Sequence, residues 1–348
     1  MDQRKQCKAP FASGITVTHK GYFLRIADRG VQALTEYVTD DDQLFVVTHM
    51  ALIEVDPQMW SLRVDGMVTN PISITLDEIL ALPRLDVHSV HECAGSPLTP
   101  KVAKRRVGNV VWNGVRLSDV LDLCGIQPGA AYVWTEGLEW GEFAGIKDEA
   151  FVKDLPLHKA LAPEVLLAVA LNGKPLRAER GGPVRLVVPG WYGTNSVKWV
   201  GKITLADRRA PGSYTTRFYN DPTPAGPRPV WDIAPECVIV SPADNSVVSA
   251  GEPTNIEGWA WSDAGVTRVE VSVDGGKNWK VAKHAGRRDF SWQHFSLSWI
   301  FRVGEHRIFC RCFDARGVGQ PVSSARNEIH SITITAISTA ATHNAMPS

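Results

Sequence analysis

The proline-rich stretch NDPTPAGPRPVWD, residues 220–232, divides the sequence into two parts. Proline lacks a backbone N–H and has a fixed φ angle, so such a stretch is excluded from helices and from central strands. We interpret it as a linker. Residues 1–40 show no regular pattern and are expected to form an irregular N-terminal arm. The sequence therefore predicts one domain over residues 41–219, a second over residues 233–337 and a flexible tail over residues 338–348.

The composition narrows the class of protein. Hydrophobic residues make up 44% and charged residues 21% of the 348 residues, which is typical of a globular protein with room for two cores. Lys plus Arg and Asp plus Glu both number 37, which argues against a nucleic acid or a membrane surface as the partner. No apolar run approaches the roughly 20 residues that span a bilayer. No export signal is recognisable at the start of the given sequence, which leaves the compartment open: periplasmic if a signal has been removed, otherwise cytoplasmic.

The first domain is expected to be α+β and mainly β. From Leu44 onward, short strands alternate with turn residues and a few short helices. Thr75 and Glu78 form the spacing of a capping box, which predicts a helix that ends before Pro83. Ser118 and a glycine seven residues later predict the beginning and the end of another helix.

The second domain shows a different pattern. The run VTRVEVSVDGGKNWKVA, residues 266–282, alternates valines on one face, turns at Asp274 and Gly275 and resumes at Trp279. This pattern is typical of a β-hairpin. Similar short strands recur at regular spacing over about a hundred residues, which predicts an immunoglobulin-like β-sandwich.

The cysteines give few metal-binding or redox signals. No C-x-x-C pair occurs, which argues against a zinc ribbon or a thioredoxin-like motif. Cys310 and Cys312 lie two apart in a strand-like run and are expected to pack on the same side, because free cysteine buries readily. Cys124 ends a predicted helix and is expected in the core.

Cys93 lies in the small-residue turn of HSVHECAGSP, residues 88–97. The sequence leaves open whether it is a buried thiol, a nucleophile, a zinc ligand or a thiolate in a tight backbone cradle. A nucleophile needs a base, and His91 is the nearby candidate. Residues two apart on a strand are roughly 7 Å apart, too far for a direct hydrogen bond. The sequence therefore disfavours a cysteine protease.

A second stretch has the composition of an anion site. Arg180, Arg185 and Lys198 lie among glycine-rich turns at Gly181, Gly190 and Gly193. Backbone amides in such turns, together with fixed cations, bind phosphate. The alternative is a set of solvated charges beside a strand.

Taken together, these stretches resemble the sulfite oxidase family of mononuclear molybdenum-cofactor oxidoreductases. The resemblance runs from about Leu44 to Val322, and its motifs occur in the family's order. These motifs are FVVTH (45–49), VDPQMWSLRVDG (55–66), HECAG (91–95), VVWNGVRLSDVL (110–121), TEGLE (135–139), DLPLHKALAPEVLLAVALNGKPL (154–176), GPVRLVVPG (182–190), SVKW (196–199), SPADNSVV (241–248) and VEVSVDGGKNW (269–279). The resemblance implies a sulfite-oxidase-type molybdopterin-binding domain followed by an immunoglobulin-like dimerisation domain.

The resemblance also implies how the cofactor is held. Cys93 corresponds to the family's protein ligand to molybdenum, and a soft thiolate suits such a metal. Arg185 and Lys198 correspond to the arginine and lysine that bind the terminal phosphate of molybdopterin. His49 corresponds to the histidine that contacts the pterin.

Further cofactor-binding residues are expected in the same motifs. Thr48 precedes that histidine, and Ser196 opens the SVKW motif. Arg180 stands where the family usually has histidine, which keeps a cation but alters its hydrogen-bonding geometry.

The substrate side departs from the family's pattern. Sulfite-oxidising members hold their dianionic substrate with arginines near the metal, but Val47 and Leu98 occupy those positions here. Phe151 occupies the position of the family's active-site tyrosine, and we expect it in the catalytic pocket.

Nearby cations offer a compensation for these losses. Lys101 and Lys104 are the catalytic candidates, in a basic loop that continues with Arg105 and Arg106. Lys153, near Phe151, is a further candidate. The alternative is that each of these lysines is an ordinary solvated charge without a role at the site.

The resemblance implies oxidation of sulfite or a related reduced sulfur compound by oxygen-atom transfer at molybdenum. Trp191 and Asn195 in PGWYGTNSVKW resemble bacterial members, including the sulfane dehydrogenases. No C-x-x-C-H haem motif and no haem domain are recognisable in this sequence, so the electrons are expected to pass to an external acceptor such as a c-type cytochrome or a haem subunit. A homodimer is expected. The alternatives are a less anionic substrate, or a non-catalytic binding or structural subunit that keeps the fold.

Overall fold

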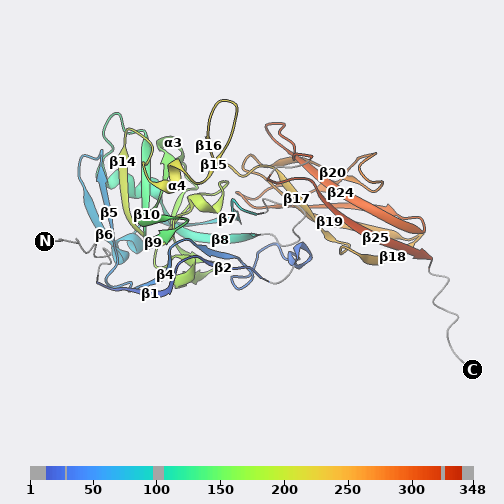
Figure 1. The fold of residues 1–348 in the computed structure, drawn as a ribbon, viewed down its shortest axis with the longest axis horizontal. Coiled ribbons are helices and arrows are strands. Elements are labelled where there is room, and N and C mark those ends of the chain that lie inside the picture. The colour runs from blue at the N-terminus through green and yellow to red at the C-terminus, as the bar shows by residue number, and fades with distance from the viewer. Residues whose placement is uncertain (1–12, 28–29, 97–105, 323–325, 339–348) are drawn as a thin grey trace, which may run out of the picture. The chain divides into compact units, whose positions relative to one another are not determined.

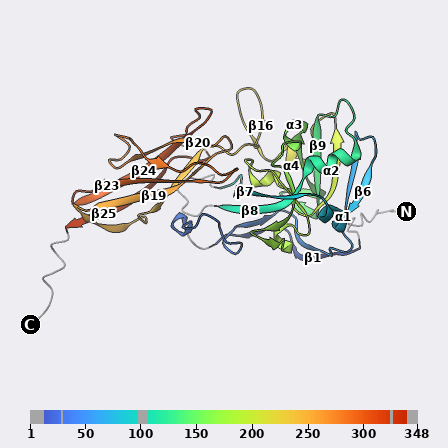
Figure 2. The same cartoon turned by 180° about the vertical axis from the view of Figure 1, so that it is seen from behind.

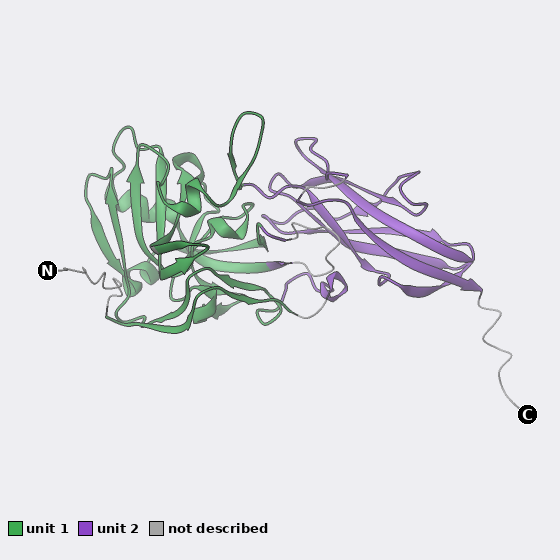
Figure 3. Cartoon of the chain, in the orientation of Figure 1, with its two compact units in different colours: residues 1–27, 40–94, 110–231 green, residues 28–39, 95–109, 232–348 purple. Residues whose placement is uncertain are grey.

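The chain forms two compact units, which Figure 3 shows in different colours. The computed structural model describes residues 13–27, 30–96, 106–322 and 326–338. Unit 1 comprises Met1–Ala27, Asp40–Ala94 and Val110–Trp231, and unit 2 comprises Asp28–Thr39, Gly95–Asn109 and Asp232–Ser348. The chain leaves unit 1 for the last time after Trp231, at the end of the proline-rich stretch.

Unit 1 is mainly β (Figure 1). One of its sheets has the strand order β10 (Ile146–Pro156), β9 (Tyr132–Phe143), β14 (Val200–Ala206), β5 (Ser61–Gly66) and β6 (Ile72–Thr75). A second sheet has the order β12 (Lys174–Pro175), β11 (Leu166–Leu171), β8 (Val107–Arg116) and β7 (Arg84–Glu92), with β13 (Arg185–Val187) paired to β11. Strands β14 and β5 run parallel.

The expectation of an irregular arm is wrong for residues 15–25. Strand β1 (Ile15–Lys20) pairs with β4 (Ala51–Val55), and β2 (Phe23–Arg25) pairs with β3 (Val46–Thr48). These ladders satisfy the backbone groups of a segment whose own sequence shows only weak alternation. Strand β2 thereby fixes β3, which carries Val46 and Val47 to the cavity described below.

Helix α1 (Leu76–Ala81) confirms the predicted capping box. The Thr75 side chain accepts from the backbone N–H of Glu78, and the Glu78 side chain accepts from the backbone N–H of Thr75. Helix α2 (Leu117–Cys124) ends at Gly125 as predicted, but its N-cap is Arg116 rather than Ser118. Strand β8 continues to Arg116, and the N–H of Leu117 donates to the carbonyl oxygen of Val165, so the helix begins without a side-chain cap.

The remaining short elements of unit 1 connect the strands. They are α3 (Leu157–Ala160), α4 (Ser213–Thr216), β15 (Asn220–Asp221), β16 (Arg228–Pro229) and the 3₁₀ segments η2 (Ala178–Arg180) and η3 (Gly193–Asn195). In β9, every second residue from Val133 to Glu139 is buried, which is the period of a strand with one face in the core. This alternation brings Glu139 to the inside of the unit.

Unit 2 is a β-sandwich, as predicted (Figure 2). One sheet has the order β17 (Glu236–Ser241), β19 (Pro253–Trp261), β23 (Gln293–Ile300) and β22 (Lys283–His284). The other has the order β18 (Ser246–Ala250), β25 (His330–Ser338), β24 (Gly304–Asp314), β20 (Val266–Ser272) and β21 (Lys280–Val281). Unit 2 also contains the 3₁₀ segment η1 (Val31–Ala33).

The sandwich core contains the predicted hairpin and the predicted cysteine pair. Strands β20 and β21 pair around a turn in which the Asp274 carboxylate accepts from the backbone of Lys277 and Asn278. Cys310 and Cys312 are fully buried, as expected from their position on one face of β24. Within the described residues, no helix has the length and apolar character needed to cross a bilayer.

Candidate functional site

Cys93 lies at the wall of a cavity in unit 1. It follows β7, whose residues from Val87 to Glu92 are all buried, so the strand carries the chain into the interior before the turn. Its own side chain is half-buried and lines the cavity together with Val47, Arg185 and Lys198. The thiol is therefore exposed to the cavity rather than enclosed in the core.

Arg185 brings a buried positive charge to this cavity. It is only 4% exposed and begins strand β13. Its guanidinium donates to the carbonyl oxygens of Arg180 (3.0 Å) and Ser196 (2.8 Å) and lies 4.8 Å from the ring of Trp112. Its Nε has no hydrogen-bond partner among the described residues. Burial, and then the charge of Arg180, lowers the pKa of Arg185 to about 9.

Lys198 adds a second cation. Its Nζ lies 4.3 Å from the ring of Trp199 and donates to the carbonyl oxygen of Glu179 over 3.4 Å. Gly181 has a φ of +92°, and a Cβ there would come within 2.7 Å of the Lys198 Cβ. Glycine is therefore required for Lys198 to pass this close to the backbone. Burial lowers the pKa of Lys198, and the negative charge of Glu139 acts in the opposite direction.

Arg180 lies beside the same cavity but is already paired. Its guanidinium forms an ion pair with Asp41 and donates to the carbonyl oxygens of Leu44 and Phe45. Most of its donors are therefore used to fix the segment before β3. Among the residues that the structure describes, no carboxylate forms a corresponding ion pair with Arg185 or Lys198. Buried charges are normally paired, so Arg185, with the half-buried Lys198 beside the same cavity, indicates a site for an anionic group.

His49 lines the cavity together with two aromatic residues, Phe151 and Tyr219. Its ring stacks on Phe151 with 5.1 Å between ring centroids, and its Nε2 lies 2.5 Å from the hydroxyl of Tyr219. Burial lowers the pKa of His49 to about 3, with further contributions from Lys198 and Lys153. The imidazole is therefore neutral at physiological pH and acts as a hydrogen-bonding group, not as a cation.

His91 is held in a different way. Its ring stacks on Phe45 at 5.4 Å and meets Trp112 edge-on, also at 5.4 Å. Burial and the charges of Arg185 and Arg180 lower its pKa well below the usual value. The ring thus serves as a neutral part of the cavity wall.

Comparisons with known proteins match both units. The family described as oxidoreductase molybdopterin binding domain matches residues 49–214, and the family described as Mo-co oxidoreductase dimerisation domain matches residues 228–336. Mitochondrial sulfite oxidase from Homo sapiens is 31% identical over 317 residues, which cover 81% of this chain and 57% of that protein. The chain belongs to the sulfite oxidase family.

Further members show the same likeness. Sulfite oxidase from Arabidopsis thaliana is 31% identical over 308 residues, which cover 79% of this chain and 78% of that protein. The crystal structure of the sulfane dehydrogenase SoxCD from Paracoccus pantotrophus superposes with a TM-score of 0.76 at 30% identity, covering 86% of this chain and 82% of that chain. The chain spans between 53% and 57% of the length of the mammalian sulfite oxidases that it matches.

The structure brings together most of the residues that the sulfite oxidase resemblance singled out. His49, Cys93, Phe151, Arg180, Arg185, Ser196 and Lys198 all line the cavity, as does Val47. The Ser196 hydroxyl accepts from the backbone N–H of Val188, so it shapes the loop beside Arg185. Thr48 is fully buried next to the cavity-lining residues, and its hydroxyl has no partner among the described residues.

Other predicted residues lie elsewhere. Leu98, Lys101, Lys104 and Arg105 fall outside the described residues. Lys153 is not at the cavity surface. It is 1% exposed, its Nζ donates to the carbonyl oxygen of Tyr214 over 2.9 Å, and it lies 5.3 Å from the ring of Tyr219.

The sequence analysis missed Glu139 and Tyr219, which both line the cavity. Glu139 accepts from the backbone N–H of Met50, and burial raises its pKa. Glu139 is the last residue of the TEGLE motif, and the buried alternation of β9 was the signal that it faces the interior. Tyr219 directly precedes the proline-rich stretch, where no local pattern marks it.

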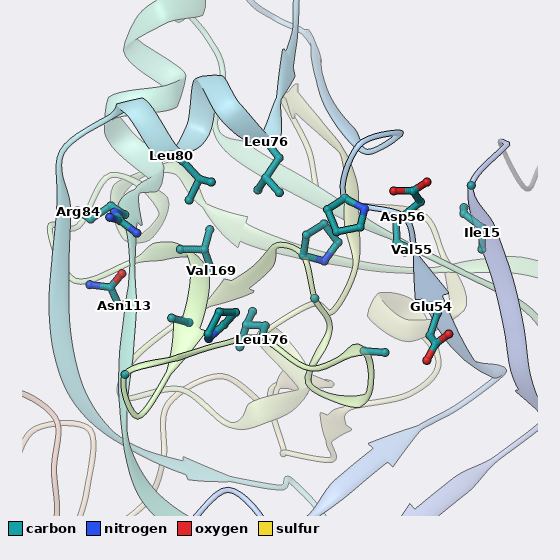
Figure 4. A pocket seen from close by; sticks show the side chains of 18 of the residues that line it. Ile15, Glu54, Val55, Asp56, Leu76, Leu80, Arg84, Asn113, Val169 and Leu176 are labelled. Atoms are coloured by element: carbon teal, nitrogen blue, oxygen red, sulfur yellow. The ribbon is translucent and has the colours of Figure 1, made fainter.

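A larger cavity of about 1280 Å³ lies elsewhere in unit 1 (Figure 4). Figure 4 shows Leu76, Leu80 and Val169 grouped in one part of it, with Arg84 and Asn113 to one side. None of the described residues that line this cavity is a cation or thiol predicted for the site. The cavity around Cys93 is therefore the candidate for the family's chemistry.

Proposed function

We propose that this protein is a molybdenum-dependent oxidoreductase that oxidises sulfite or a related reduced sulfur compound and passes the electrons to an external acceptor. The observation that carries the proposal is the meeting, in one cavity, of the half-buried Cys93 with Arg185 and Lys198. A thiol, the buried Arg185 and the half-buried Lys198, neither of them in an ion pair with a carboxylate among the described residues, match a cofactor that offers a soft metal and an anionic phosphate.

The residues present fit molybdopterin. Cys93 would hold the metal, and Arg185 and Lys198 would hold the terminal phosphate. The unpartnered Nε of Arg185 is the clearest sign of a missing acceptor. His49, with Thr48, Ser196 and Arg180, would contact the pterin or support the segments that do. When bound, the cofactor supplies the redox and oxygen-atom-transfer chemistry, and the protein positions it.

The protein's own contribution is to orient and to exclude water. Burial keeps His49 neutral, so it fixes neighbouring groups by hydrogen bonding without adding charge. Phe45 and Phe151 line the cavity and stack on His91 and His49, and this apolar wall strengthens electrostatic interactions by lowering the local dielectric constant. The cations are thereby placed where a phosphate is bound most tightly.

The cavity wall near Val47 and Phe151 supports weak binding of the substrate. A sulfur oxyanion would be held less tightly here than in a pocket lined by arginines. Val47 and Phe151 line the cavity and offer no charge. The relatives are named sulfite oxidases and a sulfane dehydrogenase, which supports a reduced sulfur compound as the substrate. We expect a high KM for sulfite.

The proposed partners are a second copy of the chain and an electron acceptor. Unit 2 contains most of the match to the dimerisation domain over residues 228–336, which supports a homodimer. A c-type cytochrome or a haem-bearing subunit is the proposed acceptor.

Metal and pterin analysis tests the proposal directly. Protein purified from a host that makes the cofactor should contain near one molybdenum by mass spectrometry and near one oxidised pterin by fluorescence per chain. It should then reduce cytochrome c or ferricyanide when sulfite or thiosulfate is added. Protein without metal and pterin would contradict the proposal and favour a non-catalytic subunit.

A further inference from the structure

Tyr219 brings a phenol hydroxyl into the Cys93 cavity from a segment outside the main sheets. It lies three residues after α4 and immediately before β15. Its φ is +57°, a left-handed backbone conformation that is unusual for a bulky residue and costs on the order of 1 kcal/mol or more. Strain of this kind persists only where the surroundings enforce it, and here it directs the side chain to the cavity.

Several contacts fix the orientation of this phenol. Its hydroxyl is 2.5 Å from the Nε2 of His49, whose ring is held by stacking on Phe151. On the ring of Tyr219, the buried ammonium of Lys153 lies 5.3 Å from the centroid. A cation over the ring is attracted to its π-face. Both contacts leave little freedom for the side chain to turn away.

Tyr219 and Cys93 line the same cavity, so the phenol and the thiol face a shared space. A phenol is neutral at physiological pH, so Tyr219 is a neutral hydrogen-bond donor there. Val47 and Phe151, which line the same cavity, have no polar side-chain atom to donate.

We propose that Tyr219 is a substrate-binding residue: its hydroxyl oxygen accepts from the Nε2–H tautomer of His49, which leaves its one proton to donate a hydrogen bond to an oxygen of a sulfur oxyanion bound beside Cys93. This inference rests on the proposed function. Val47 and Phe151 offer the substrate no polar contact, and Tyr219 would supply it. A neutral hydrogen-bond donor orients the bound oxyanion but attracts it less strongly than a cation would, which agrees with weak binding. Lys153 acts as a positioning residue through the ring.

Sulfate binding tests the inference without turnover. Sulfate is an unreactive tetrahedral oxyanion, and its dissociation constant for the molybdenum-loaded protein is measured by isothermal titration calorimetry. Tyr219→Phe should weaken sulfate binding roughly tenfold, as expected for loss of a hydrogen bond to a charged group. The KM for sulfite should rise by a similar factor while kcat changes little, which is the pattern of a lost binding contact.

Tyr214→Phe is the matched control. Tyr214 packs on the same Phe151 ring at 4.5 Å, but its hydroxyl has no hydrogen-bond partner among the described residues and it does not line the cavity. Its replacement should leave sulfate affinity within about twofold, since no cavity donor is removed.

The outcomes separate this inference from the proposed function. Unchanged sulfate affinity in Tyr219→Phe, with molybdenum and pterin content intact, would overturn the inference. So would loss of the cofactor in that variant, because Tyr219 would then serve the cofactor rather than the substrate. A loaded wild-type protein that oxidises no sulfur compound would contradict the proposed function, while its sulfate binding would still report on Tyr219.

Discussion

Cys93 in unit 1 and the cysteines of unit 2 place the same side chain in opposite environments. Cys93 is half-buried at the wall of a cavity that also contains Arg185. In unit 2, Cys237, Cys310 and Cys312 are fully buried in the sandwich core. Burial raises the pKa of Cys237 and of Cys312, which keeps these thiols protonated and inert. The environment, and not the residue type, separates the proposed metal ligand Cys93 from the packing cysteines of unit 2.

The polar groups of the two units differ in the same way. In unit 2, the thiol of Cys237 donates to the Gln320 side chain over 3.0 Å, and Arg316 forms ion pairs with Asp314 and Asp232. In unit 1, the guanidinium of Arg185 has an unpartnered Nε and no carboxylate partner among the described residues. Arg316 is thus paired within the protein, whereas we propose that Arg185 is paired by a bound ligand.

The largest expected effect is that of Cys93→Ser on activity. Removal of the proposed protein ligand to molybdenum should lower the rate of sulfite-dependent cytochrome c reduction by more than the roughly 100-fold typical of losing a residue that only supports a ligand. The matched change Cys310→Ser should leave the rate per molybdenum unchanged and lower only the thermal stability, because it buries a hydroxyl in the core of unit 2. An active Cys93→Ser enzyme would show that Cys93 is not the metal ligand.

The next effect concerns the unpaired cation. Arg185→Met should lower the pterin content of the purified protein, because one charged contact to a phosphate corresponds to roughly 10- to 150-fold in affinity. The same change should not destabilise the cofactor-free protein, since it removes a buried charge without a carboxylate partner. Pterin fluorescence and urea unfolding measure the two effects. Arg316→Met in unit 2 is the control, and an equal loss of pterin there would refute the assignment.

Lys153→Met tests whether unit 1 carries a destabilising charge. Burial lowers the pKa of Lys153 from 10.5 to about 8, so its ammonium is charged and penalised at pH 7. Between pH 8 and 10.5 the unfolded chain binds more protons than the folded one, and the stability of the wild-type protein rises with pH. The variant should therefore be more stable by roughly 1 kcal/mol or more at pH 7, and its advantage should shrink by pH 9.5. Urea unfolding at the two pH values measures this; a variant less stable at pH 7 would show that the ammonium is well compensated.

The smallest effect is expected from Cys312→Ala. Shortening a fully buried side chain of β24 leaves a small void and should lower the free energy of unfolding by roughly 1 kcal/mol. Molybdenum content and sulfite oxidation should not change, because no residue of the site is altered. A loss of metal in this variant would mean that the thiols of unit 2 take part in the chemistry after all.

Local sequence patterns predicted the elements that depend on local contacts. Thr75 and Glu78 form their capping box within four residues, and the turn at Asp274 is closed by its own side chain. The helix predicted to begin at Ser118 begins at Leu117 instead, because its first N–H is satisfied by Val165, almost fifty residues further along the chain. The residues that match the motifs of the sulfite oxidase family predicted most of the cavity wall, including Cys93.

By itself, the sequence predicted the last crossing from unit 1 to unit 2 at the proline-rich stretch, the β-rich character of both units, and the cysteine and cations that match the family's motifs. Only the tertiary structure decided that Tyr219 meets His49 and that Lys153 lies over the Tyr219 ring. The physical reason is the distance along the chain: His49 and Tyr219 are 170 residues apart, and such a contact leaves no period, cap or turn signal in either segment. Tertiary packing also distinguished the half-buried thiol of Cys93 from the fully buried thiols of unit 2, because burial depends on which parts of a segment the rest of the fold covers.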